Sequence, residues 1–292
     1  MKIDSSTVLY CILGNPVKHS FSPYLHNPAF KKLKINAVYL AFQPEKIADG
    51  VNGIRALGIK GCSITIPFKS EIIPFLDEVS EIASLIGAVN TVLNKDGKLV
   101  GTNTDAFGFY KALSNATSLT GKKIAIFGSG GSARSGVFSL FYYDNPQKVF
   151  VLARNKEKRE KLREEILTSF DRIGKKIGKE RLVVFDLSEW KDVMNQVDVI
   201  VNTTPLGMVP DTNSSIIDFS FFPEKKIVMD IVYNPLMTKF LTFAKEKKCK
   251  VVYGIEMLLY QAIKQFEFWT ERRISEKFMR KYLVKALKIN KS

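Results

Sequence analysis

The 292-residue chain has few of the residues from which metal centres and disulfide frameworks are built. Its only histidines are His19 and His26, and its three cysteines are scattered without a C-x-x-C pair. Zinc sites need closely spaced Cys or His ligands, and disulfide-rich folds need cysteines in even number at framework spacings. The sequence therefore predicts no metal and no disulfide framework. It favours a location in the reducing cytoplasm.

Long apolar runs are missing as well. A membrane-spanning helix needs roughly 18 or more largely apolar residues in a row, and no stretch of this chain approaches that length. The apolar run at residues 8–13 is too short and too soon interrupted for a secretion signal. It is better interpreted as a first strand, and we expect no membrane association.

Acidic residues are also in short supply. The chain has 44 Lys and Arg against 29 Asp and Glu, a net charge of +15. Such an excess is typical of nucleic-acid binding, of solvated helix faces, or of a protein that attracts anionic small molecules. The basic runs at 154–163, at 172–181 and beyond 272 look like exposed helix faces and a loop without an aromatic stacking platform. We therefore expect a small-molecule partner and no nucleic acid.

The most informative stretch that is present is KKIAIFGSGGSARSG, residues 122–136. A short apolar strand ends at glycine, and Gly128, Gly130 and Ala133 fit the pattern G-x-G-x-x-G/A. The first position allows the tight turn, the second lets the backbone approach a pyrophosphate, and the third lets the next helix pack closely. A helix over 131–142 directs its N-terminal amides at the phosphates. Because another strand follows, dinucleotide binding is favoured over a mere tight turn.

The tip of that next strand indicates which dinucleotide binds. NAD sites place an acidic residue there, which accepts hydrogen bonds from the ribose 2′-hydroxyl. Here Arg154 stands at the tip, with Lys156 and Lys158 close by. A guanidinium pairs with a 2′-phosphate, whereas a carboxylate repels it. The sequence therefore predicts NADP as the cofactor. The alternative, that these are solvated charges opening a surface helix, stays open above all for Lys158.

Strand-like and helix-like stretches alternate along the chain, which predicts an α/β fold. In the first third we expect strands at 8–13, 37–42, 59–66, 89–93 and 99–102, and helices at 23–33, 44–57, from Pro67, at 78–86 and at 106–114. Asp96 and Gly97 predict a type I′ hairpin. Beyond that we expect strands at 122–127, 148–152, 182–185, 198–201, 227–231 and 250–253, and helices at 131–142, 156–170 and 236–247, with two more within 256–288.

The polar loop at 115–121 predicts a joint between two α/β domains. The first covers residues 1–114 and is joined by C-terminal helices from about 256 to 292. The second, residues 115–255, is expected to be a Rossmann-type domain with a parallel, doubly wound sheet.

Four polar segments of the first domain follow expected strands, at residues 14–27, 61–69, 87–91 and 101–108. In the first, Ser20 and Ser22 alternate around Phe21, so both hydroxyls can face one way. Because Ser22 precedes Pro23, a helix cap is the alternative explanation. The last segment offers Thr104 and Asp105 as equal cap candidates.

These segments closely resemble the shikimate dehydrogenase family over nearly the full length. The matching motifs are G-N-P-x-x-H-S-x-S-P-x-x-H-N at 14–27, G-A-V-N-T at 87–91, N-T-D-x-x-G at 103–108, N-T-T-P-L-G-M at 202–208, D-I-V-Y-N-P-L-x-T at 230–238 and G-I-E-M-L-L-Y-Q-A at 254–262. Several independent motifs in the right order make this match far more specific than a glycine-rich turn alone.

The resemblance implies NADPH-dependent reduction of the C3 ketone of 3-dehydroshikimate, in a cleft between the domains. It implies that Lys69 protonates the developing alkoxide and that Asp105 orients it and binds a ring hydroxyl. The resemblance assigns the binding of the substrate carboxylate to Ser20 and Ser22. Ring hydroxyls are assigned to Thr65, Asn90 and Gln261, with Tyr233 also lining the substrate. The cofactor is assigned to Gly128, Ser129, Gly130, Gly131, Ser132, Ala133, Arg154, Asn155, Lys158, Thr203, Gly254 and Met257.

The chain departs from the family pattern at a few positions. Ser63 stands where G-x-N-V-T usually has asparagine, Asn155 where threonine is usual after the strand-tip arginine, and Ser129 and Ser132 where alanines are common. The nearest alternative is a quinate/shikimate dehydrogenase that uses NAD or NADP, against which Arg154 counts. The paired serines count against a more distant alternative, a methylenetetrahydrofolate dehydrogenase. A non-enzymatic alternative, a metabolite sensor, is expected to lack Lys69 or Asp105, and both are present. We expect a monomer or a homodimer.

Overall fold

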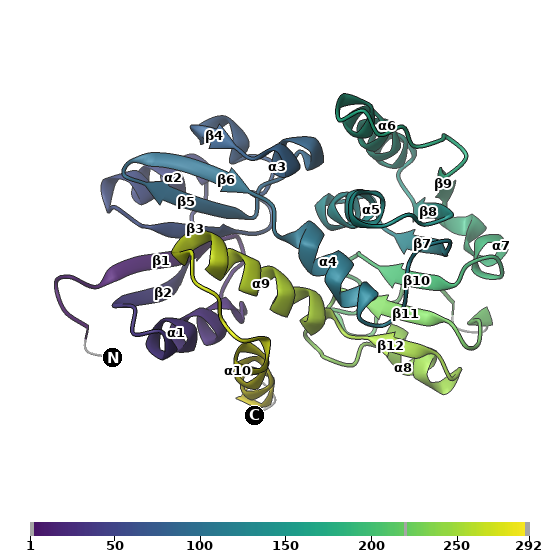
Figure 1. Cartoon of the computed structure of the whole chain (residues 1–292). Helices are drawn as coiled ribbons and strands as arrows, with labels where there is room; N and C mark the ends of the chain where they lie inside the picture. Colours follow the sequence, from purple (N-terminus) through teal and green to yellow (C-terminus); the bar gives the residue numbers. More distant parts are fainter. Residues whose placement is uncertain (1–2, 219–220, 290–292) are drawn as a thin grey trace. The chain divides into compact units, whose positions relative to one another are not determined.

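The computed structural model describes residues 3–218 and 221–289, which form two compact units (Figure 1). Unit 1 consists of Met1–Thr104 and Leu259–Ser292, and unit 2 of Asp105–Leu258. The sequence predicted the division after residue 114, but helix α4 (Asp105–Ser114) groups with unit 2. It packs along α5 (Gly131–Tyr143), where Gly136 lets the Phe109 ring come close. The functional division into two domains stays a prediction.

The sheet of unit 1 is mixed, with the strand order β2-β1-β3-β5-β6-β4. Its strands are β1 (Val8–Leu13), β2 (Ala37–Phe42), β3 (Gly61–Ile64), β4 (Glu78–Val79), β5 (Thr91–Lys95) and β6 (Lys98–Thr102). β1 runs parallel to β2 and β3, whereas β5 is antiparallel to β3 and β6. The ends of β1, β3 and β6 and the start of β5 therefore share one edge, which we call the site edge.

Helices of unit 1 cover this sheet. They are α1 (Ser22–Lys32), α2 (Ile47–Ala56), α3 (Glu81–Ile86), the short 3₁₀ helix η1 (Ile73–Phe75), α10 (Glu276–Ile289) and the greater part of α9 (Gly254–Thr270). The core between α2 and the sheet is largely aliphatic and includes Leu13, Ile54 and Val92. C-terminal α10 packs against α1, so the last two predicted helices exist, and residues from Leu259 onward group with the N-terminal unit.

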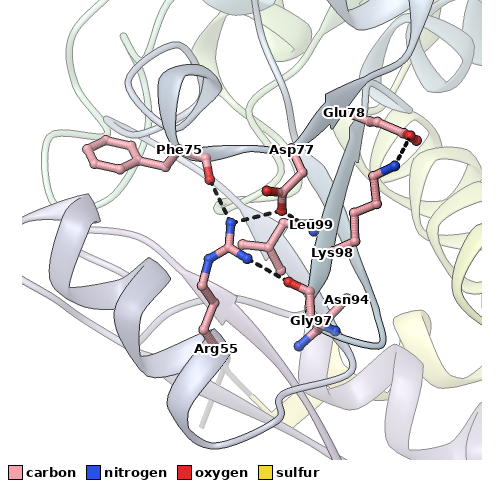
Figure 2. A network of polar contacts seen from close by, with 8 residues as sticks. All are labelled: Arg55, Phe75, Asp77, Glu78, Asn94, Gly97, Lys98 and Leu99. Carbon is pink, nitrogen blue, oxygen red and sulfur yellow. Dashed lines mark hydrogen bonds and ion pairs between the residues drawn. The ribbon is translucent and has the colours of Figure 1, made fainter.

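The far end of the β5–β6 hairpin is held by an arginine (Figure 2). Asp96 and Gly97 both have positive φ, as the predicted type I′ turn requires. The Arg55 guanidinium donates to the Gly97 carbonyl at 2.6 Å and pairs with Asp77 at 2.8 Å. Asp77 in turn accepts from the Leu99 amide at 2.7 Å. We call this exposed group the Arg55 cluster; it ties α2 to the hairpin at the end of β5 opposite the site edge.

The sheet of unit 2 is parallel throughout, with the order β12-β11-β10-β7-β8-β9. Its strands are β7 (Lys123–Phe127), β8 (Lys148–Ala153), β9 (Leu182–Asp186), β10 (Val199–Asn202), β11 (Ile227–Asp230) and β12 (Lys250–Val252). Besides α4 and α5, its helices are α6 (Lys156–Arg172), the 3₁₀ helix η2 (Leu187–Glu189), α7 (Trp190–Met194) and α8 (Lys239–Glu246). Strand order reverses beside β7, which confirms the doubly wound fold and places its switch point at the glycine-rich turn.

One predicted helix of unit 1 is wrong, and another begins later than predicted. Pro67 opens a series of turns rather than a helix. The Lys69 carbonyl, which a helix needs as an acceptor, instead accepts from the Val89 amide at 2.8 Å. The predicted helix at 78–86 begins only at residue 81, because Glu78–Val79 pairs with β6 and the Ser80 side chain caps α3. Among the described residues, no helix is long and apolar enough to cross a bilayer.

Candidate active site

The paired serines lie at the site edge, just after β1. Ser22 is the first residue of α1 and is buried. Phe21 occupies the N-cap position before it, and within the described residues no side chain caps this helix. The alternative explanation of Ser22 as a helix cap is therefore wrong. Its hydroxyl accepts from the Ser20 hydroxyl at 3.2 Å, and its amide donates to Ser20 Oγ at the same distance. The fold thus holds the two hydroxyls side by side.

After β3 the chain turns through Thr65 and reaches Lys69, both of which are half-buried. The Thr65 amide donates to the Leu13 carbonyl at 2.9 Å, and a side chain at Gly14 would collide with the Thr65 methyl. The turn after β3 therefore lies directly against the turn after β1. Lys69 is fixed through its carbonyl bond to Val89 in the segment that leads into β5.

Asn90, just before β5, is the most highly connected side chain of this edge and is 2% exposed. Its Nδ2 donates to Thr104 Oγ1 at 3.0 Å and to Gln261 Oε1 at 3.4 Å. Its Oδ1 accepts from the Thr104 amide and the Thr91 hydroxyl, both at 2.8 Å. Three segments distant in sequence meet at this amide, and they bring together two of the residues predicted to bind ring hydroxyls.

Sequence reasoning missed three buried polar residues behind this edge: Tyr39, Ser63 and Gln265. The Tyr39 hydroxyl donates to Ser63 Oγ at 2.6 Å, and Ser63 donates to Gln265 Oε1 at 3.0 Å. Gln265 Nε2 then donates to the Asn90 carbonyl at 3.1 Å. Ser63 was noted only as a departure from the family pattern. The helical spacing of Gln261, Gln265 and Trp269 was the signal that one face of α9 contacts this edge.

His26 lies in the same region, fully buried beside Tyr39, with ring centroids 4.6 Å apart. Burial lowers the pKa of its imidazole to about 3, because the apolar and aromatic surroundings penalise the charged form. His26 is therefore neutral at physiological pH, as an uncharged part of the packing around Tyr39.

Two predicted site residues lie in unit 2 instead. Asp105 begins α4 directly after Thr104 and is 6% exposed. Tyr233 follows β11 and is half-buried, and burial raises the pKa of its hydroxyl. The roles predicted for both stay predictions.

The glycine-rich turn of unit 2 has the geometry that the pattern predicted. Gly128 has φ of +116°, and a side chain there would collide with Thr203 Oγ1 at 2.6 Å. A Cβ on Gly130 or Gly131 would meet no described atom within 4 Å, so the backbone is open where a phosphate is expected. α5 begins here without a side-chain cap among the described residues, and no acidic residue lies in its first turn. Its free amides suit an anion. Ser129 and Ser132 are half-buried in this turn.

Arg154 follows the end of β8 and is exposed to solvent, and a second arginine holds the backbone beside it. Arg159, which sequence reasoning missed, donates from Nη1 to the Ala153 carbonyl at 2.9 Å and pairs with Asp186 at 2.9 Å. The Asn155 side chain caps α6 by accepting from the Lys158 amide at 2.8 Å. The structure thus gives Asn155 a local capping role, and Lys158 an exposed side chain.

A network of buried hydrogen bonds forms where β10 and β11 end, beside the glycine-rich turn. Asn202 Nδ2 donates to Asp230 at 2.9 Å, and Asp230 also accepts from Thr238 Oγ1 at 2.6 Å and the Val232 amide at 3.0 Å. Burial is the dominant influence on Asp230 and raises the pKa of its carboxyl to about 7. Thr203, between these strands and Gly128, donates to the Phe127 carbonyl at 2.5 Å.

Gly254 and Met257 begin α9 at this end of unit 2. A side chain at Gly254 would collide with the Ile231 carbonyl at 2.4 Å, so only glycine lets α9 start so close to the chain that leaves β11. Met257 is 8% exposed. In the described part of the chain, no group of three or more His, Cys, Asp or Glu side chains is arranged to hold a metal ion.

Comparison with known proteins identifies the family. Residues 12–92 match the family model for the shikimate dehydrogenase substrate binding domain, and residues 254–283 match that for the shikimate 5′-dehydrogenase C-terminal domain. The chain is 40% identical over 285 residues to a shikimate dehydrogenase (NADP(+)) of Geobacillus kaustophilus, and the match covers 96% of this chain and 99% of the relative. The chain belongs to the shikimate dehydrogenase family.

Solved structures of shikimate dehydrogenases share the whole architecture. One, in complex with NADP+, has a TM-score of 0.87 and 37% identity, and the match covers 98% of each chain. Another, from Thermus thermophilus in complex with NADP(H) and shikimate, has a TM-score of 0.82 and 32% identity over 96% of this chain and 100% of that chain. The resemblance and the fold predicted from the sequence are confirmed.

Proposed function

We propose that this protein catalyses the reversible, NADP-dependent reduction of 3-dehydroshikimate to shikimate, a step of aromatic amino-acid biosynthesis. The observation that carries the proposal is the convergence at one sheet edge of the paired serines, Thr65, Lys69 and the Asn90 amide. An acidic, polyhydroxylated ring needs hydroxyl donors for its carboxylate and amides for its hydroxyls, and the site edge of unit 1 offers both kinds of group.

In this proposal Ser20 and Ser22 donate hydrogen bonds to the substrate carboxylate, while Thr65, Asn90 and Gln261 hold the ring hydroxyls. Lys69 gives its proton to the oxygen that gains negative charge during reduction. Such proton transfer contributes about 10²–10⁴-fold to the rate. Asp105 orients the ammonium group and accepts from a ring hydroxyl, with Tyr233 lining the substrate.

The residues of unit 2 fit the cofactor. The open backbone at Gly130 and Gly131 and the uncapped start of α5 suit a pyrophosphate. Arg154 stands where NAD-binding proteins carry an acid, and it suits a 2′-phosphate. NADPH supplies the hydride. Ser129, Ser132, Ala133, Thr203, Gly254 and Met257 complete the proposed contacts, with Lys158 as a second positive charge near the ribose phosphate.

A steady-state assay of the purified protein tests this function. We expect NADPH oxidation with 3-dehydroshikimate, and kcat/KM at least about tenfold lower when NADH replaces NADPH, as loss of one charge-assisted bond predicts. We also expect poor turnover of 3-dehydroquinate. Comparable turnover of both substrates, with NADH as good as NADPH, would favour a quinate/shikimate dehydrogenase instead.

We further propose that the enzyme works in the cytoplasm as a monomer or a homodimer. The three cysteines are free thiols, as a reducing compartment requires. Size-exclusion chromatography with light scattering measures the oligomeric state directly, and a tetramer would contradict this proposal.

A further inference from the structure

Helix α6 packs against β8 and β9 (Figure 1), and Arg159 in its first turn reaches the place where both strands end. Its Nη1 donates to the Ala153 carbonyl at 2.9 Å, to the Arg154 carbonyl at 3.3 Å and to Asp186 Oδ2 at 2.9 Å. Only 11% of the Arg159 side chain is exposed, and a charged side chain is rarely buried to this extent without a partner. Arg159 therefore ties the β8 tip, Ala153 and Arg154, to the end of β9.

Asp186, the last residue of β9, supplies the negative charge that Arg159 faces. In the register of the two strands it lies opposite Ala153, the last residue of β8. Hydrogen bonds from Ser188 and the pairing with Arg159 lower the pKa of the Asp186 carboxyl, so it is ionised at physiological pH. Glu189 adds a second carboxylate, whose Oε2 accepts from the Asp186 amide at 2.7 Å. The end of β9 thus carries negative charge directly beside the β8 tip.

We propose that Arg159 is a specificity-determining residue that preserves the preference for NADP over NAD by pairing with Asp186 beside the β8 tip. Arg159 acts through Asp186, whose charge it cancels next to the place where Arg154 is proposed to bind the 2′-phosphate. This inference rests on the proposed function and goes beyond it, because neither Arg159 nor Asp186 is among the residues assigned to the cofactor.

The 2′-phosphate is the group that distinguishes the two cofactors at this tip. A phosphate monoester carries a charge of about −1.5 to −2 at pH 7, whereas NAD has an uncharged hydroxyl in its place. Neighbouring strands lie about 4.8 Å apart, which is less than the screening length of about 8 Å at physiological salt. An unpaired carboxylate at the end of β9 therefore repels a phosphate bound at the β8 tip and leaves a hydroxyl there unaffected.

The chain offers a matched control on the same helix. Arg159→Met removes the charge and the donors while keeping an unbranched side chain that favours a helix. Arg163 follows one turn later, and its Nε donates to the carbonyl of Leu182, the residue at the opposite end of β9, at 2.9 Å. Arg163→Met therefore removes the same charge and a bond between α6 and β9, but it leaves Asp186 with its partner.

The first test measures the affinities of NADP+ and NAD+ by calorimetry. We expect Arg159→Met to lower the ratio of NADP+ to NAD+ affinity about threefold or more, as the loss of one partly exposed ion pair predicts. Arg163→Met should lower the melting temperature and change the ratio much less. Added salt should reduce the effect of Arg159→Met on the ratio, because mobile ions screen the repulsion.

The second test removes the charge of Asp186 itself. Asp186→Asn keeps the size of the side chain, and its amide oxygen can still accept a hydrogen bond. In the Arg159→Met protein we expect this exchange to restore most of the lost NADP+ preference. Made alone, Asp186→Asn should raise the ratio, because the positive charge of Arg159 is then uncompensated. The single exchange keeps Arg159 in place and tests the charge even if Arg159→Met does not fold.

The outcomes separate this inference from the proposed function. A ratio that is unchanged in Arg159→Met, or that falls equally in Arg163→Met, would overturn the role of Arg159 alone, provided that the wild type prefers NADP+. Asp186→Asn without effect on the ratio in either background would do the same, because the charge at the end of β9 then does not reach the cofactor. Wild-type protein that binds NAD+ as tightly as NADP+ would contradict the cofactor of the proposed function and overturn this inference with it.

Discussion

The two units arrange the groups that we propose to contact their ligands in different ways. Unit 1 relies on buried side chains bonded to one another, as at Asn90, which precedes β5 and is bonded to Thr104, just after β6, and to Gln261 of α9. Unit 2 relies on backbone geometry, as at Gly128 with its positive φ and at the uncapped start of α5. The backbone geometry of a turn can be predicted from a local sequence pattern. A network of side chains forms only once distant segments have come together.

The units also bury titratable groups of opposite type. In unit 1 burial lowers the pKa of His26 to about 3, and in unit 2 burial raises the pKa of Asp230 to about 7. Each shift keeps the group neutral over part of the pH range in which it is ordinarily charged. The units therefore differ in the kind of site that we propose for each ligand, and they also differ in how their buried groups respond to pH.

The largest expected effect comes from unit 1. Lys69→Ala should lower kcat about 10²–10⁴-fold, because the proton it donates matters only in the transition state. Shikimate affinity should fall much less, which calorimetry can check beside the rate measurement. A variant with wild-type kcat would exclude Lys69 as the proton donor.

The corresponding change in unit 2 is Arg154→Asp. It removes a positive charge that suits a 2′-phosphate and adds a carboxylate that repels the phosphate and accepts from a free ribose hydroxyl. We expect the kcat/KM ratio of NADP+ over NAD+ to fall about 10- to 100-fold. Lys158→Ala serves as the matched control and should reduce the ratio less. If the ratio is unchanged at fixed salt, Arg154 is a solvated surface residue.

The two buried groups predict opposite pH responses. In the unfolded state His26 takes up a proton below its ordinary pKa of 6.5, whereas in folded unit 1 it stays neutral down to about pH 3. The contribution of neutral His26 to stability is therefore complete above pH 6.5 and is lost as the pH falls toward 3. Folded unit 2 keeps a proton on Asp230 that the unfolded chain releases above 3.8, so stability is lost as the pH rises from 3.8 to about 7. Each slope is at most about 1.4 kcal/mol per pH unit.

The two tryptophans allow the slopes to be measured separately, since Trp269 lies in unit 1 and Trp190 in unit 2. Urea unfolding of Trp190→Phe and Trp269→Phe proteins follows one unit at a time. We expect His26→Phe to flatten the acid slope of unit 1 and Asp230→Asn to flatten the slope of unit 2. Equal slopes before and after these changes would show that neither burial shift affects stability.

The smallest effect is expected at Asn155. Because its side chain caps α6, Asn155→Ala should lower the free energy of unfolding by about 1 kcal/mol. NADP+ affinity should stay within about twofold, because Asn155 Oδ1 is bonded to the Lys158 amide while Arg154 carries the charge that suits the 2′-phosphate. A large loss of NADP+ affinity without loss of stability would support the cofactor role that the sequence predicts for Asn155.

The fold could be predicted from local patterns because each strand and turn of unit 2 carries its own signal. The turn at Gly128 and the strand that ends at Arg154 are examples. Pro67 was misread as a helix start because the bond from Val89 to the Lys69 carbonyl is a long-range contact that no local pattern reveals. The same holds for Ser63 and Gln265, whose hydrogen bond joins residues far apart in the chain. For Arg159, the burial that makes it a brace for the β8 tip was not visible in a charged run.

The central claim, that unit 1 binds the substrate and unit 2 the cofactor, is tested most directly by a crossed binding experiment. Calorimetry measures the affinity of Ser22→Ala and Arg154→Asp proteins for shikimate and for NADP+, each ligand alone. We expect Ser22→Ala to weaken shikimate about tenfold or more and to leave NADP+ unchanged, and Arg154→Asp to do the reverse, as charge-assisted bonds predict. If either change weakens both ligands equally while the protein stays folded, the assignment of one ligand to each unit is wrong.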